Sequence, residues 1–394
     1  MNHFIPLSVP NFEGNEQKYV DSAIKEGWVS TGGAYITELE KKLASFTKAA
    51  DVCACQSGTS ALHLSLIECG VQPGNTVIVP TLTFIAAVNP VKYQFADTVF
   101  MDCDDSLCID PLKLEKFCEE ECFFEDGKLC LKRNNSHVKA VVVVHVFGNL
   151  ADMEAIMDIA GKYNLKVIED ATEALGSYYT GGRYKGKFAG TIGDFGAYSF
   201  NGNKIITTGG GGAVTARDEE TVRHIRYLST QAKDDVHYYI HNEVGYNYRM
   251  TNLQAALGVA QMEELPEFIS RKNRNFEIYK KEFENFEYAR LVEFREGTYS
   301  NKWFYSLEIN RDFVDAPMRE IITKLEESGV QTRPIWGLIH QQKPYADSCA
   351  YEIDKALYYS NCILNIPCST QITEEEINYV VSQIKKILVD LKSK

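Results

Sequence analysis

The sequence predicts an α/β fold with a mostly parallel sheet, because short apolar segments of strand length alternate with amphipathic segments of helix length. A chain of 394 residues can bury a large core and is long enough for two domains. Its hydrophobic residues (45%) and charged residues (24%) occur at levels ordinary for a soluble globular protein. We therefore expect a large domain over residues 1–265 and a smaller C-terminal α/β domain over residues 266–394.

The expected elements of the large domain follow from the spacing of apolar residues. Two helices are predicted near the N-terminus, at residues 15–26 and 36–47. An amphipathic helix at residues 59–69 carries Leu62 and Leu66 on one face. The next segments alternate, with strands at 76–79, 98–101, 139–145 and 166–169, and with helices at 85–93, 111–120 and 152–163, the last capped by Asp152.

The stretch 119–137 interrupts this alternation, because it is polar, charged and cysteine-bearing. Gly127 and the pair Asn134-Asn135 within it are turn signals. We expect an inserted surface loop or hairpin here, between a helix and the next strand.

The C-terminal domain is expected to begin with a long helix that opens at Pro266 and ends near Phe286. A strand at 213–215 and a helix from Asp218 precede it. The later elements are expected at 303–309, 318–328 and 331–334, with a final helix from Glu374.

The charge and the apolar runs of the chain exclude several classes of protein. A net charge of −13 argues against non-specific nucleic-acid binding, which needs a basic surface. The N-terminal residues lack the charged and apolar regions of a signal peptide. The longest apolar run, at residues 138–147, is interrupted by Lys139 and His145 and is too short to cross a bilayer. We expect a cytoplasmic protein that binds neither nucleic acid nor membrane.

The 11 cysteines predict neither a disulfide framework nor a metal site. Their number is odd and they are spread through a large chain. A zinc or iron–sulfur site would need paired Cys-x-x-Cys spacing with a matching second pair, which the sequence lacks. We expect reduced, mostly buried thiols and no metal.

Ser57-Gly58-Thr59 directly precedes a predicted helix and could bind a phosphate. The free backbone N–H groups and the dipole at a helix start favour an anion, and the hydroxyls can add hydrogen bonds. A plain serine N-cap is the alternative interpretation.

Asp170 follows a predicted strand, at the edge of the sheet where open α/β folds bind ligands. A carboxylate there could keep a pyridine nitrogen protonated and so make the ring an electron sink. The alternative is an N-cap for the segment that follows.

Lys204 follows a strand-like run at residues 197–200, in which Ser199 could donate to the same phosphate. The run Gly209–Gly212 allows close approach of the backbone to a ligand. It is not a dinucleotide loop, because a strand-like segment follows it where that motif requires a helix. A solvated loop lysine is the alternative. An amine, a carboxylate and a phosphate cup together are what pyridoxal phosphate (PLP) requires from a protein.

Further candidate residues have weaker signals. Phe84 follows a strand and could stack on a planar ring, or could be a core aromatic. Asn247 and Arg249 offer an amide and a bidentate cation for a carboxylate or phosphate, or could form a surface turn. Arg333 and His340 could contact a substrate or be merely structural.

The assembled set resembles the nucleotide-sugar aminotransferases of the DegT/StrS type, a branch of the fold-type I PLP enzymes. The resemblance covers nearly the whole chain, and its matching blocks begin with residues 5–7 and 27–32, which include Thr31. The later blocks lie at 57–59, 169–171, 199–204 and 245–249. The resemblance implies a seven-stranded-type, mostly parallel sheet in the large domain and a PLP cofactor.

The resemblance also implies roles for individual residues. Lys204 matches the Schiff-base lysine and Asp170 the partner of the pyridine nitrogen. Phe84 matches the aromatic residue that stacks on the ring. Asn247 matches a phosphate contact from the neighbouring subunit, which implies a homodimer with shared active sites. The matched phosphate cup is Gly58, Thr59 and Ser199, and the candidate substrate-binding residues are Thr31, Arg249, Arg333 and His340.

Two positions depart from the family pattern. Glu173 stands where the family usually has Gln or His, near the phenolic oxygen of the cofactor, so we expect its pKa to be raised or its carboxylate to turn away. Gly210 replaces a family glutamate. The segments 144–149 and 199–204 and the insertion resemble the subgroup that serves legionaminic-acid-type sugar pathways.

The expected reaction is a two-stage transamination from an amino acid, glutamate by the resemblance, to a 4-keto-6-deoxy sugar linked to a nucleotide diphosphate. A PLP-type sugar dehydratase is one alternative, but such relatives carry His at the position of Lys204. A non-catalytic PLP- or sugar-binding regulator is the other, and no basic patch or DNA-binding motif supports it. The choice between UDP and GDP, and the stereochemistry of the sugar, stay open.

Overall fold

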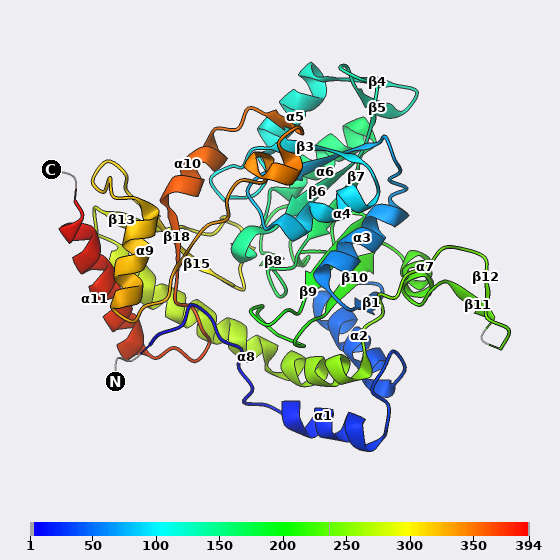
Figure 1. Ribbon diagram of the computed structural model, residues 1–394, viewed down its shortest axis with the longest axis horizontal. Helices are drawn as coiled ribbons and strands as arrows, with labels where there is room; N and C mark the ends of the chain where they lie inside the picture. Colours follow the sequence, from blue (N-terminus) through cyan, green and yellow to red (C-terminus); the bar gives the residue numbers. More distant parts are fainter. Residues whose placement is uncertain (1–3, 236, 393–394) are drawn as a thin grey trace.

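The computed structural model describes residues 4–235 and 237–392 (Figure 1). Its large sheet contains the predicted seven-stranded arrangement, in the order β1-β10-β9-β7-β6-β2-β3. In this sheet β10 runs antiparallel to β1 and β9, and the pairs from β9 to β3 are parallel. The strands are β1 (Val52–Cys55), β2 (Thr76–Pro80), β3 (Asp97–Met101), β6 (His137–Val144), β7 (Lys166–Asp170), β9 (Phe195–Ser199) and β10 (Gly212–Ala216).

Helices cover this sheet, so its central strands are buried on both faces and read as nearly continuous apolar runs. The N-caps Asp110, Asp152 and Asp218 each accept backbone N–H groups in the first turn of their helices. The helices are α3 (Gly58–Glu68), α4 (Asn89–Tyr93), α5 (Pro111–Glu120), α6 (Met153–Tyr163) and α7 (Glu219–Ser229).

The single helix predicted at residues 85–93 is two helical pieces. A 3₁₀ turn, η1 (Ile85–Ala87), precedes α4, and Pro90 lies in the first turn of α4. Because proline lacks an N–H and restricts the residue before it, a helix starts at Pro90 more easily than it continues through it.

The insertion at residues 119–137 is a hairpin, which is one of the two forms, loop or hairpin, that the sequence predicts. Strands β4 (Cys122–Glu125) and β5 (Lys128–Leu131) pair in antiparallel fashion. Asp126 and Gly127 between them have φ values of 50° and 73°, which fit a tight hairpin turn. Since β5 also pairs with β6, and β17 (Cys349–Tyr351) pairs with β3, the described part of the sheet has ten strands.

The helix predicted to open at Pro266 begins much earlier. Helix α8 spans Asn252–Phe283 and contains Pro266 in its interior. Thr251 and Gln254 form a capping box that fixes its start, and Leu265 and Phe268 continue its buried face past the proline. A single lost backbone hydrogen bond does not end a helix that is packed so extensively. The predicted division between residues 265 and 266 falls within α8 and stays a prediction.

A second, antiparallel sheet lies beyond the end of α8, to the left in Figure 1. Its order is β13 (Ala289–Leu291), β15 (Tyr305–Ile309), β18 (Ile363–Ile366) and β16 (Arg333–Pro334). The N-terminal segment reaches this part of the molecule, since Ile5 exchanges backbone hydrogen bonds with Gly329 and Gln331. The helices of this region are α9 (Met318–Glu327), α10 (Lys355–Cys362) and α11 (Glu374–Asp390).

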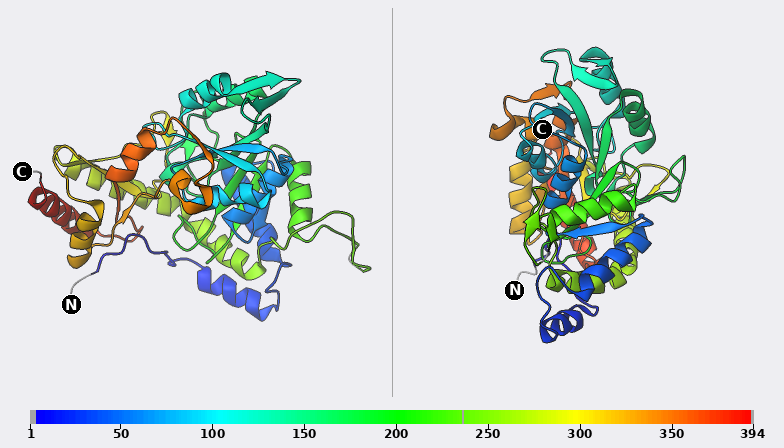
Figure 2. Two further views of the ribbon diagram at one scale, coloured as in Figure 1. Left: turned by 45° about the horizontal axis from the view of Figure 1, so that its top comes forward. Right: turned by 90° about the vertical axis from the view of Figure 1, so that its right-hand side faces the viewer.

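The remaining elements are two N-terminal helices, which lie beside α8 (blue beside yellow-green in Figure 2), and two short strand pairs. Helices α1 (Glu16–Lys25) and α2 (Ala34–Thr47) pack on α8. Two short strand pairs are β8 (Tyr178–Tyr179) with β14 (Thr298–Tyr299), and β11 (Lys233–Asp235) with β12 (Ile240–His241).

The cysteines and the lengths of the helices are two further features of the chain. All 11 cysteines are free, and of these Cys130 and Cys349 are half-buried and the others buried. Among residues 4–235 and 237–392, no helix is long and apolar enough to cross a membrane.

Candidate active site

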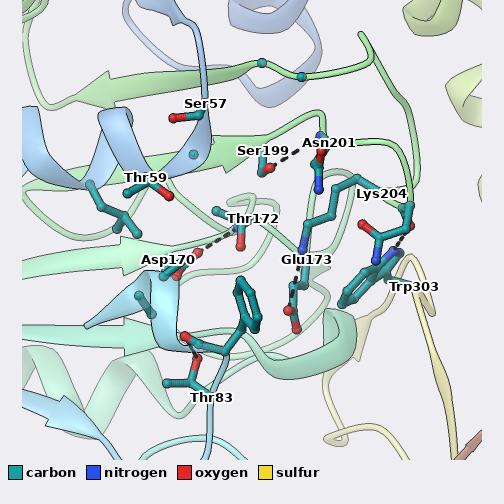
Figure 3. A pocket seen from close by; sticks show the side chains of 18 of the residues that line it. Ser57, Thr59, Thr83, Asp170, Thr172, Glu173, Ser199, Asn201, Lys204 and Trp303 are labelled. Atoms are coloured by element: carbon teal, nitrogen blue, oxygen red, sulfur yellow. Dashed lines mark hydrogen bonds and ion pairs between the residues drawn. The ribbon is translucent and has the colours of Figure 1, made fainter. Parts of the chain in front are cut away.

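A cavity of about 420 Å³ opens at the carboxyl ends of β7 and β9, where they meet the start of α3 (Figure 3). Its lining also includes Trp303 and Phe304, just before β15, and Trp336, just after β16, from segments that connect strands of the second sheet. Seven residues that the sequence analysis singled out line this cavity together: Gly58, Thr59, Phe84, Asp170, Glu173, Ser199 and Lys204.

The start of α3 has the local features of an anion site. Ser57 is the N-cap, and its Oγ accepts the N–H of Ser60 at 3.0 Å. The N–H groups of Gly58 and Thr59, at the first helical positions, have no acceptor within the helix. A Cβ at Gly58 would lie 2.9 Å from Ser199 Cβ and 3.0 Å from Thr172 Cγ2, so only glycine allows this close approach. The N-cap and phosphate interpretations of Ser57-Gly58-Thr59 are therefore compatible.

Asp170 is the last residue of β7 and is buried. Its Oδ1 accepts the backbone N–H of Thr172 at 3.1 Å. Burial raises the pKa of the Asp170 carboxyl, while the Thr172 hydrogen bonds and the positive charge of Lys204 lower it. A buried carboxylate of this kind is stabilised by a cation brought next to it, such as a protonated ring nitrogen.

Lys204 extends into the cavity and is not a solvated loop lysine. Its backbone N–H donates to Asn201 O at 2.9 Å, in the turn after β9. Its side chain is only 12% exposed, and Nζ lies 3.5 Å from Glu173 Oε1. The same nitrogen lies 3.9 Å from the centroid of the Trp303 ring. The amine is therefore held within reach of a ligand in the cavity.

Glu173 is buried beside Lys204, and its carboxylate does not turn away. Its Oε2 accepts the backbone N–H of Phe147 at 2.8 Å. Burial raises the pKa of Glu173 to about 7, partly opposed by the charge of Lys204 and by the Phe147 N–H. The shift has the direction that the sequence analysis expects.

The glycine run allows the backbone to pass close to the site. Gly210 and Gly211 line the cavity. A Cβ at Gly212 would lie 2.5 Å from the carbonyl carbon of Ser57, so β10 can meet the start of α3 only with glycine there. Gln254 Nε2 donates to Gly210 O at 2.7 Å and fixes the run.

The aromatic wall of the cavity was missed by the sequence analysis. Trp303, Phe304 and Trp336 line the cavity. The predicted residue Phe84 also lines it and is 55% exposed, so it is not a core aromatic. Trp303 and Phe304 stack with centroids 4.1 Å apart. Trp303, Phe304 and Trp336 come from segments more than 90 positions after Lys204. Their local sequence contains no spacing signal for a shared cavity. The polar residues missed are Thr83, Thr172, Asn201 and Asn203.

A model of the DegT/DnrJ/EryC1/StrS aminotransferase family matches residues 10–385. The chain belongs to this family. Since aminotransferases of the family are PLP-dependent, this chain is a PLP-dependent aminotransferase.

Individual relatives of this aminotransferase cover nearly its full length. The GDP-perosamine synthase of Caulobacter vibrioides is 34% identical over 397 residues, with 98% of each chain covered. The GDP-perosamine synthase of Escherichia coli O157:H7 is 33% identical, with 98% of this chain and 99% of the relative covered. The crystal structure of the aminotransferase TlmJ from Streptoalloteichus hindustanus superposes with a TM-score of 0.87 at 23% identity and confirms the fold, with 98% and 100% of the chains covered.

The cavity of this aminotransferase fits PLP. The helix start and the Thr59 and Ser199 hydroxyls would face the phosphate, and the glycine at position 58 lets Ser199 lie close to the helix start. The buried Asp170 carboxylate would face the ring nitrogen, and Lys204 extends into the same cavity with its amine toward Glu173. A phosphate site, a carboxylate and an amine are thus gathered in one cavity of suitable size.

Four other candidate residues do not line the cavity of this aminotransferase. Thr31 and Asn247 are exposed. Arg333 is exposed, and its guanidinium donates to the carbonyl of Thr332 at 2.9 Å. The Nδ1 of His340 lies 2.6 Å from Thr81 Oγ1, and burial lowers the pKa of its imidazole. In the described chain, His340 holds a loop beside the site.

Arg249 is not available to a ligand, contrary to the role suggested for it. Its guanidinium forms a hydrogen-bonded ion pair with Glu40 and donates to Ala54 O at 3.2 Å. Its side chain is 9% exposed. Glu40 also accepts the backbone N–H of Ala54 at 2.8 Å, so the pair joins α2, β1 and the segment before α8. Because the Arg249 guanidinium is paired with the buried carboxylate of Glu40, it is not free to bind a substrate anion.

We expect Arg249→Leu to lower the free energy of unfolding by about 3 kcal/mol, because it leaves the buried Glu40 without its main partner. Chemical denaturation with and without PLP would measure the loss. Arg183→Leu is the control, since that arginine forms an exposed ion pair with Asp158 and should contribute far less. Equal effects of the two substitutions would show that the buried pair contributes no special stability.

Proposed function

We propose that this aminotransferase transfers an amino group from an amino acid to the 4-keto carbon of a nucleotide-linked 4-keto-6-deoxy sugar. The observation that carries the proposal is the match to two enzymes named GDP-perosamine synthase over 98% of this chain, with Lys204 and Asp170 in one cavity. The donor we propose is L-glutamate. Because both named relatives act in GDP-sugar chemistry by their names, GDP-linked sugars are tested beside UDP-linked ones.

A finer proposal concerns the product. The segments 144–149 and 199–204 and the β4–β5 hairpin are the features that favour a legionaminic-acid-type surface sugar. The names of the two relatives point to another sugar, so the acceptor panel must contain both N-acetylated and non-acetylated 4-keto sugars.

Each side chain of the cavity has a proposed task. PLP, when bound, supplies an electron sink that stabilises negative charge on the carbon next to the transferred nitrogen. Asp170 keeps a proton on the ring nitrogen, and Lys204 removes and returns the proton at the reacting carbon. Gly58, Thr59 and Ser199 hold the phosphate, and Phe84 covers one face of the ring.

The protein acts as a homodimer in this proposal. Asn247 is exposed and lies outside the cavity of its own chain. We propose that it reaches the phosphate site of the neighbouring subunit, so that each site is completed by its partner. Its backbone is fixed by a bridge to Thr230, which would keep the amide in place before the subunits meet.

The test is a two-step reaction with purified protein. We expect glutamate to convert the protein-bound PLP to its amino form, with a matching amount of 2-oxoglutarate. Addition of single UDP- and GDP-linked 4-keto sugars should then give one aminated product, seen by mass spectrometry. Bound PLP without any glutamate-dependent conversion would contradict the proposal and favour a regulator, and release of ammonia with a deoxygenated sugar would favour a dehydratase.

A further inference from the structure

The amine of Lys204 lies in a site for a cation inside the cavity. On one side Nζ is 3.5 Å from Glu173 Oε1. On the other it is 3.9 Å from the centroid of the Trp303 ring, a distance at which the face of an indole attracts a positive charge. Figure 3 shows Lys204 reaching toward Glu173 with Trp303 beside it.

The carboxylate half of this site is fixed by its own contacts. Glu173 Oε2 accepts the N–H of Phe147 at 2.8 Å, which leaves Oε1 to face Lys204. Phe147 has a φ of 56°, in the left-handed region, and its ring packs against Trp336 with centroids 4.6 Å apart. A strained residue held by packing thus aims an N–H at Glu173.

The aromatic half is fixed from a different part of the chain. Trp303 Nε1 donates to Asn203 O at 2.7 Å, next to Lys204 in sequence. The carbonyl of Trp303 accepts the buried Nζ of Lys272, on α8, at 2.8 Å. The ring is also stacked on Phe304 at an angle of 9°. Because the carboxylate and the ring are each held by contacts with the protein, the site is organised before a cation enters it.

We propose that Glu173 and Trp303 form a holding site for the amine of Lys204 while that amine is not bonded to the cofactor. The inference rests on the proposed function, which requires Lys204 to give up its bond in each half-reaction. In that exchange the double bond of the cofactor carbon passes from the Lys204 nitrogen to the nitrogen of the donor. The doubly bonded nitrogen carries one proton both before and after the exchange, so two of the three protons of the donor ammonium pass to Lys204. Lys204 then leaves as an ammonium, and atoms and charge balance.

The charges around Glu173 make the holding site sensitive to pH. The groups that face its carboxyl are the Lys204 ammonium, the Phe147 N–H and, at longer range, the Asp170 carboxylate. Since burial raises the pKa of Glu173 to about 7, the carboxyl is charged above that pH and neutral below it. The attraction to the ammonium is therefore present above about pH 7 and is lost as the pH falls.

The experiment measures the reactivity of Lys204 in full-length protein from which PLP has been removed. A short pulse of acetic anhydride at pH 8 is followed by peptide mass spectrometry, with the exposed Lys185 as internal reference. We expect Glu173→Gln to raise the acetylation rate of Lys204 about tenfold, because the charged form loses its carboxylate partner. Trp303→Phe should raise it about threefold. Trp28→Phe is the matched control, because Trp28 is exposed and does not line the cavity, and it should leave the rate unchanged.

A second measurement follows the capture of added PLP by the same proteins between pH 6 and 9. The wild type should show a step near pH 7 that is lost in Glu173→Gln and retained in Trp28→Phe. Equal acetylation rates in the wild type, Glu173→Gln and Trp303→Phe would overturn the holding site even if the wild type transaminates. Absence of any glutamate-dependent half-reaction in the wild type would instead overturn the proposed function. Because the two informative substitutions lie on different elements, misfolding of one leaves the other decisive.

Discussion

Lys204→Ala should reduce turnover by about 10³- to 10⁴-fold, because the lysine amine is the group that moves the proton in the proposed reaction. Among the described residues, no other lysine lines the cavity that could replace it. The measurement is kcat with glutamate and the accepted sugar, together with the visible absorbance of the lysine-linked cofactor and its trapping by borohydride. The variant should show neither absorbance nor trapping.

Lys185→Ala is the matched control for Lys204→Ala, since Lys185 lies on an exposed turn near the same part of the chain. It should keep wild-type kcat and borohydride trapping. Wild-type turnover in Lys204→Ala would refute the role of this lysine. Loss of turnover with retained borohydride trapping in Lys204→Ala would show that another residue forms the bond to the cofactor.

Asp170→Asn should reduce kcat by about 10²- to 10³-fold, because an amide does not stabilise a positive charge on the ring nitrogen as a buried carboxylate does. The substitution preserves volume, and the Asn oxygen can still accept the Thr172 N–H that Asp170 Oδ1 accepts at 3.1 Å. Single-turnover kinetics with glutamate would measure the loss in the chemical step apart from cofactor release.

Stability distinguishes a catalytic role of Asp170 from a structural one. Burial raises the pKa of Asp170 in the folded chain, so its ionisation disfavours the fold increasingly as pH rises from the unfolded pKa toward the folded one. Removing that charge should leave the melting temperature of the PLP-free protein at pH 7 unchanged or higher. Asp158→Asn, on the exposed face of α6, is the control with full activity. A lower melting temperature in Asp170→Asn would show that the carboxylate holds the fold rather than the cofactor.

The local sequence predicted most elements of the fold, because strand and helix periods, caps and turns are short-range properties. Asp152 caps α6 as expected, and Gly127 lies in the turn of the predicted hairpin. The start of α8 was placed at Pro266 because proline is a strong local signal. The capping box at Thr251 and a buried face that continues through the proline outweighed it.

The site was predicted where its residues lie at the ends of recognisable elements. Gly58 starts a helix and Asp170 ends a strand, and both positions bring a side chain or an N–H to the same edge of the sheet. Trp303 and Trp336 were not predicted, since nothing in their local sequence indicates that the loops which carry them meet Lys204. Arg249 was predicted to bind a substrate because a guanidinium binds anions in general. The sequence does not show that the anion next to it is the Glu40 carboxylate.

The sequence by itself determined the chemistry of this aminotransferase. An amine, a carboxylate and a helix start, each at the end of its element, are local features, and few sites other than a PLP site combine all three. Only the tertiary structure decided the partners of those groups. It pairs Arg249 with Glu40, and it places Lys204 between Glu173 and Trp303. The physical reason is that charge pairing and aromatic contact depend on distances between segments far apart in the chain, which only the packing of the two sheets around α8 brings together.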